Sequence, residues 1–107
     1  MSAPATKSAL SREKTITITL DASGTPVVSE DPIRLKKPKN EEVTWECTSP
    51  FTVFFDRETP FYEAMYDQDF PCSGLARRNV KEDKDKIYKY TVTVAGKSLD
   101  PGVIIDK

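Results

Sequence analysis

Histidine is absent from this 107-residue chain, and cysteine and glycine are scarce, with two and four residues. Without histidine the chain lacks the side chain that most often serves as a general base and as a nitrogen ligand to metals. Two cysteines are too few for a disulfide scaffold of the kind that holds small secreted domains together. No apolar run approaches the roughly 20 residues that a membrane-spanning helix needs. We therefore expect neither an enzyme nor a membrane-spanning protein.

An excess of charge of one sign is also lacking. Sixteen Lys and Arg stand against seventeen Asp and Glu, so the net charge is −1. Recruitment to nucleic acid or to an anionic membrane is therefore not expected. The start of the chain has no apolar centre of the kind found in secretory signals. We expect a flexible arm at residues 1–13 and one monomeric domain at residues 14–107, in the cytoplasm, or in the periplasm if a signal once preceded Met1.

Alternation of apolar and polar side chains predicts an all-β domain. The alternating segments cover residues 14–20, 43–47, 51–55 and 87–94, and short extended segments are expected near 26–28 and 32–35. Residues 43–47 and 51–55 are expected to be a strand pair about a tight turn, and residues 95–102 a long turn. Residues 103–105 are expected to be a strand buried on both faces. About seven such strands predict an antiparallel Greek-key β-sandwich.

Residues 56–85 interrupt this pattern with charges and aromatic side chains. Thr59 followed by Pro60 is typical of a helix start, which predicts one short helix in this long loop. This segment either caps the core, with Phe61 and Met65 facing inward, or forms a protein-binding surface. The residues of the candidate surface are Tyr62, Tyr66 and Phe70, with Arg77 and Arg78 as a polar rim.

Sulfur ligands offer a second chemistry. Cys47, Met65 and Cys72 are the residue types that select monovalent copper, although Cys47 is expected on the inward face beside Trp45. A disulfide between Cys47 and Cys72 and two buried free thiols both remain open.

Paired carboxylates are a third chemistry. Asp56 with Glu58, and Asp67 with Asp69, have the residue types of a glycosidase site, but charges two apart in a loop are usually solvated. We likewise expect solvated side chains for the lysines of residues 36–39 and for the mixed charges of residues 81–86.

The stretch VTWECTSPFTVFFD, residues 43–56, and the stretch IYKYTVTV, residues 87–94, resemble the cupredoxins, the blue-copper sandwiches. Phe51 stands where that family has its first histidine ligand, and Val92 where its cysteine ligand falls. The resemblance therefore implies a cupredoxin-like domain without copper or another cofactor, similar to small bacterial proteins that end like residues 99–106. Such a domain would be a non-enzymatic interaction or structural accessory module with an unknown protein partner. The alternative is a carrier of monovalent copper.

Overall fold

The computed structural model describes residues 12–107, which form ten β-strands and one turn of 3₁₀ helix. These are β1 (Arg12–Leu20), β2 (Pro26–Val28), β3 (Ile33–Lys36), η1 (Lys37–Lys39), β4 (Glu41–Cys47), β5 (Thr52–Phe54), β6 (Met65–Asp67), β7 (Tyr88–Lys89), β8 (Thr91–Val94), β9 (Lys97–Leu99) and β10 (Gly102–Asp106). The arm predicted at residues 1–13 lies outside the described residues up to position 11, and its last two residues belong to β1. No helix within residues 12–107 is long and apolar enough to cross a bilayer.

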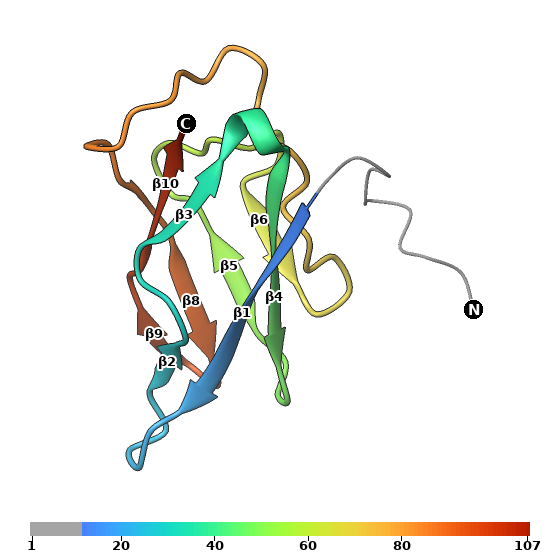
Figure 1. Cartoon of the computed structure of the whole chain (residues 1–107). Helices are drawn as coiled ribbons and strands as arrows, with labels where there is room; N and C mark the ends of the chain where they lie inside the picture. The colour runs from blue at the N-terminus through green and yellow to red at the C-terminus, as the bar shows by residue number, and fades with distance from the viewer. Residues whose placement is uncertain (1–11) are drawn as a thin grey trace.

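The strands form three sheets, so the prediction of an all-β domain is confirmed. Their orders are β2-β1-β4, β3-β10-β7 and β6-β5-β8-β9. In Figure 1 the β1–β4 pair passes in front of β5, while β3 and β10 run side by side along one flank. The prediction of about seven strands is wrong for the described residues, and so is the all-antiparallel pairing. Two of the pairs, β1 with β4 and β3 with β10, are parallel.

The predicted strand pair of residues 43–55 is also wrong, because β4 and β5 belong to different sheets. β4 lies beside β1, and its other edge meets residues 71–73, where the backbone N–H of Trp45 donates to the carbonyl oxygen of Pro71 at 3.0 Å. β5 pairs with β6 and β8 instead. The turn between β4 and β5 thus carries the chain from one layer to the other.

Two further segments differ from the prediction. Residues 87–94 are not one strand: β7 pairs with β10, while β8 pairs with β5 and β9. The expected long turn after β8 contains β9, because Ala95 and Gly96 both adopt positive φ, of 51° and 82°, and close a tight hairpin. Two successive residues with positive φ match the twist of a two-residue hairpin turn.

The core lies between the layers and contains the apolar side chains that alternation placed inward. Trp45 on β4 is at its centre, with ring centroids 5.1 Å from Tyr66, 5.5 Å from Tyr90 and 6.4 Å from Phe55. The indole N–H of Trp45 donates to the Tyr90 hydroxyl oxygen at 3.3 Å. β10 is buried on both faces, as predicted, with its apolar residues 103–105 all in the interior.

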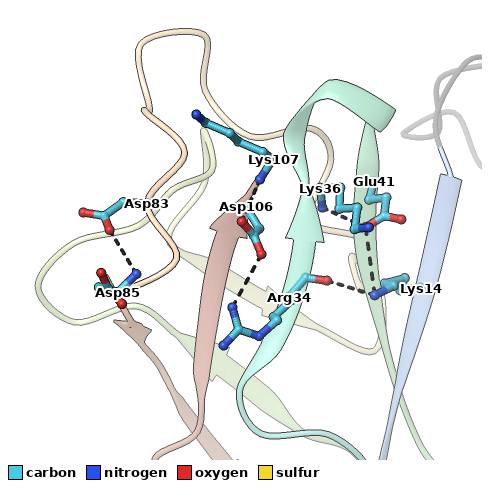
Figure 2. Close-up of polar contacts among 8 residues, drawn as sticks. All are labelled: Lys14, Arg34, Lys36, Glu41, Asp83, Asp85, Asp106 and Lys107. Carbon is cyan, nitrogen blue, oxygen red and sulfur yellow. Dashed lines mark hydrogen bonds and ion pairs between the residues drawn. The ribbon is translucent and has the colours of Figure 1, made fainter.

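Charged side chains from β1 and β4 contact the edge of β3 that faces away from β10 (Figure 2). The ammonium of Lys14 on β1 donates to the carbonyl oxygen of Arg34 at 2.9 Å. The carboxylate of Glu41 on β4 accepts the backbone N–H of Lys36 at 2.7 Å, and it lies 3.9 Å from the Lys14 ammonium. An edge whose backbone groups are occupied by charged side chains is protected from pairing with another chain.

We predict that the domain loses stability at alkaline pH through Tyr66 and Tyr90. Burial raises the pKa of both phenols above the ordinary value. Such a phenol does not change the free energy of unfolding below about pH 10, which is its pKa in the unfolded chain. Above that pH each such phenol lowers the free energy of unfolding by about 1.4 kcal/mol per pH unit, because only the unfolded chain loses the proton. Urea denaturation followed by the fluorescence of Trp45, the single tryptophan, at pH 7 to 11 measures the slope.

The Tyr90→Phe variant is the matched test. Because the variant lacks the acceptor of the Trp45 indole N–H, we expect it to be less stable at pH 7 by about 1 to 3 kcal/mol. Above pH 10 its stability should fall less steeply than that of the wild type. An identical alkaline slope in the two proteins would contradict the assignment.

Candidate functional site

The structure separates the residues of the predicted interaction surface. Tyr62 and Phe70 are 65% and 68% exposed, which confirms their predicted exposure. Tyr66 is only 4% exposed, so its predicted exposure is wrong. Arg78 is exposed, whereas Arg77 is half-buried and does not lie on a free rim.

The predicted short helix is replaced by bends and by β6. The hydroxyl oxygen of Thr59 accepts the backbone N–H of Phe61 at 3.1 Å, which closes a local turn instead of starting a helix. The backbone N–H of Phe55 then donates to the carbonyl oxygen of Ala64 at 2.8 Å, so the chain continues as a strand beside β5. Side chains of a strand alternate between its faces.

This alternation decides which side chains β6 presents. Tyr66 lies opposite Val53 and faces the core, where its hydroxyl donates to the carbonyl oxygen of Glu63 at 2.7 Å. Met65 lies opposite Phe54 on the outer face and is 59% exposed. The prediction that Met65 faces inward is therefore wrong, while Phe61 is fully buried as expected.

Four exposed apolar side chains belong to β6, to the neighbouring strand β5 or to the loops at the two ends of β6. Together we call them the β6 surface: Phe54, Tyr62, Met65 and Phe70. Phe54 and Met65 are cross-strand neighbours. Phe70 is held by the turn that ends β6, in which the carboxylate of Asp67 accepts the backbone N–H groups of Asp69 at 2.9 Å and Phe70 at 3.1 Å. At the other end, the Tyr62 hydroxyl accepts the backbone N–H of Arg78 at 3.4 Å. The sequence analysis missed Met65 because it assumed a helical period, and it did not connect Phe54, on the outer face of the strand predicted at residues 51–55, with this surface.

The charges along this segment have one sign. Residues 62–70 contain Glu63, Asp67 and Asp69 and no lysine or arginine. Arg78 contacts Tyr62 through its backbone N–H. The β6 surface is therefore apolar with acidic neighbours.

The structure does not bring Cys47, Met65 and Cys72 together. The thiol of Cys72 is buried and donates to the carboxylate of Glu42 at 2.8 Å, while Met65 points outward from β6. Cys47 is half-buried at the far end of β4, and both cysteines are free. Within residues 12–107 no group of three or more Cys, Asp or Glu side chains is arranged to hold a metal ion.

Glu42 is a buried carboxylate that sequence reasoning missed. The residue is 0% exposed, and its second carboxylate oxygen has no hydrogen-bond partner among the described residues. Nothing in the stretch KKPKNEE, residues 36–42, indicated this burial. The burial depends on Cys72, which is 30 residues away and pairs with Thr44. No local sequence signal indicates such a contact.

The structure also places the paired carboxylates and the two positions, Phe51 and Val92, that the resemblance to cupredoxins singled out. Asp67 orders the turn after β6, and Glu58 forms an ion pair of 2.8 Å with Lys86. Phe51 and Val92 are both buried in the core. Asp56 and Glu58 line one surface cavity of about 330 Å³, in which Glu58 is paired with Lys86, whereas Asp67 is used within the turn after β6.

Comparisons with known proteins found no match. No family model, no curated protein and no solved structure is similar to this chain. The likeness to the cupredoxins therefore remains a prediction from residues 43–56 and 87–94.

We predict that the two thiols react at different rates. Burial, and then the hydrogen bond to Glu42, raise the pKa of the Cys72 thiol, so it is protonated and shielded near neutral pH. In the folded protein we expect Ellman's reagent to modify Cys47 quickly and Cys72 only after denaturant is added. The Cys47→Ser variant should show no fast phase and the Cys72→Ser variant one full fast thiol. A fast reaction of Cys72 in the Cys47→Ser variant would refute the buried hydrogen bond between Cys72 and Glu42.

Proposed function

We propose that this domain is a non-enzymatic protein-interaction module that binds an extended, basic segment of a partner protein along β6. The observation that carries the proposal is the β6 surface, on which four large apolar side chains lie exposed beside three acidic residues. Aromatic and methionine side chains are enriched where proteins bind one another.

The open edge of β6 supports an extended partner. Among the described strands, β6 pairs only with β5. Because Phe55 and Ala64 form a hydrogen-bonded pair, alternation makes Phe54 and Met65 a non-hydrogen-bonded pair. The backbone N–H and C=O of Met65 then point away from β5, toward the open edge. A partner strand can pair with these groups, as in strand addition.

The edge of β6 also differs from that of β3. The backbone groups of Arg34 and Lys36 at the β3 edge are occupied by Lys14 and Glu41 (Figure 2). No comparable side-chain contact reaches the edge of Met65 from the part of the chain that the structure describes. On β6 the backbone N–H and C=O of Asp67 are paired with Phe70, so within residues 12–107 the unoccupied backbone groups of this edge are those of Met65.

Charge determines the chemistry of the partner. Glu63, Asp67 and Asp69 would meet lysine or arginine side chains favourably, and such complementarity mainly accelerates association. Apolar partner side chains would contact Met65 and Phe70, and each side chain that becomes fully buried contributes about 1.5 to 3 kcal/mol. The proposed ligand is therefore an extended segment in which apolar and basic residues alternate.

We predict that selection of random phage-displayed peptides on the immobilised domain enriches sequences of this type. The triple variant Tyr62→Ser, Met65→Thr, Phe70→Ser should bind the selected peptides at least about tenfold more weakly, because anchor residues carry most interface energy. The control Leu20→Ser, Ile87→Ser removes two exposed apolar side chains away from β6 and should bind like the wild type.

The contribution of charge is tested separately with the double variant Glu63→Lys, Asp69→Lys. Neither substitution removes a side-chain hydrogen bond within residues 12–107. This variant should associate more slowly with the peptides. Enriched peptides without basic residues, or equal affinity for the wild type and the triple variant, would contradict the proposed function.

A further inference from the structure

We infer that the cavity beside Arg77 is a binding site for the phosphoryl group of a small phosphorylated molecule. The cavity measures about 340 Å³ and lies between the loop after β5 and the loop before β7. Its polar lining includes Glu58, Arg77, Asn79, Lys81, Asp83 and Lys86. This site does not depend on the β6 surface or on the function proposed for it.

Arg77 is the residue that points to a ligand. Its backbone N–H donates to the carbonyl oxygen of Pro60 at 2.8 Å, and one terminal nitrogen of its guanidinium donates to the carbonyl oxygen of Thr59 at 2.8 Å. The second of these contacts holds the guanidinium in place. Its Nε is buried and has no hydrogen-bond partner among the described residues. A charged donor left unpaired in the interior is costly, and the positive charge of a guanidinium that lines the cavity is stabilised by an anion bound there.

The other charges leave the cavity with an excess of donors. Lys86 is paired with Glu58 at 2.8 Å. One carboxylate oxygen of Asp83 accepts the backbone N–H of Asp85 at 3.0 Å, as Figure 2 shows. Lys81 forms no ion pair with any residue in the range 12–107. Arg77 and Lys81 are therefore available to bind an anion. Asp83 is the one carboxylate of the cavity lining that is not paired with a lysine, and one of its oxygens already accepts a hydrogen bond.

The loop that carries these groups is anchored at three points. The ammonium of Lys37 on η1 donates to the carbonyl oxygens of Arg78, at 2.9 Å, and of Val80. The backbone N–H of Asp83 donates to the carbonyl oxygen of Ile105 on β10 at 2.8 Å. Anchoring of this kind reduces the ordering that a ligand must impose when it binds.

The shape of the donor set favours a phosphoryl group. Arg77, Asn79 and Lys81 all line the cavity, and a tetrahedral oxyanion offers several acceptor oxygens to such a set of donors. A phosphate monoester also carries a charge of about −1.5 to −2 near neutral pH. The cavity volume lies at the lower end of the range for ligand pockets, which suits a small molecule.

The test is an NMR titration of the ¹⁵N-labelled protein with inorganic phosphate, glycerol 3-phosphate, acetate and sodium chloride at constant ionic strength. We expect the Nε–H signal of Arg77 to shift saturably with the first two probes and not with chloride. Acetate should bind more weakly than phosphate. Saturation by chloride, or no saturable shift with either phosphate probe, would overturn the site.

Two variants of equal charge make the test specific. Lys81→Gln should weaken phosphate binding about threefold, as expected for the loss of one exposed charge interaction. Arg78→Gln removes a neighbouring exposed charge outside the cavity lining and should bind phosphate like the wild type. Equal weakening by both variants would show general electrostatic attraction and overturn the inference. Binding of a phosphoserine peptide but of neither small phosphate probe would also overturn it, in favour of a protein ligand.

Discussion

The packing of Tyr66 against Trp45 is the contact on which the exposed surface of this domain depends. Their ring centroids are 5.1 Å apart, and the Tyr66 hydroxyl is satisfied by the carbonyl oxygen of Glu63. Once Tyr66 faces the core, strand alternation places Met65 on the outer face. A shift of one residue in the pairing with β5 would bury Met65 and expose a large phenol, so the core determines the register.

Much of the core could be predicted from the sequence, because alternation within each strand is a local property. Ile16 and Ile18 in β1, and Val92 and Val94 in β8, are buried as their pattern indicates. Which strands pair is a non-local property, and the tight turn after β4 did not predict that β5 lies in another sheet.

The site was harder to predict than the core. Thr59 and Pro60 are equally compatible with a helix start and with the turn that forms, and the hydrogen bond between Phe55 and Ala64 decides in favour of a strand. Tyr62 and Phe70 were predictable as exposed aromatic residues. The buried contact of Glu42 with Cys72 was not, since it joins segments 30 residues apart.

Arg77 and Arg78 illustrate how adjacent residues serve different regions. The Arg77 side chain turns inward to the carbonyl oxygen of Thr59, whereas Arg78 is exposed and its backbone N–H contacts Tyr62. The loop before β7 therefore borders both the cavity and the β6 surface. Its attachment to Lys37 and to β10 holds both regions on the same scaffold.

Hydrogen exchange of the Met65 backbone amide tests the central claim most directly. The alternation of hydrogen bonds between β5 and β6 points this N–H toward the open edge, while the N–H of Phe55 donates to Ala64. The account predicts slow exchange for Phe55 in the free domain, and for Met65 only when a basic extended peptide is bound. Slow exchange of Met65 in the free domain, or no slowing in the complex, would contradict it.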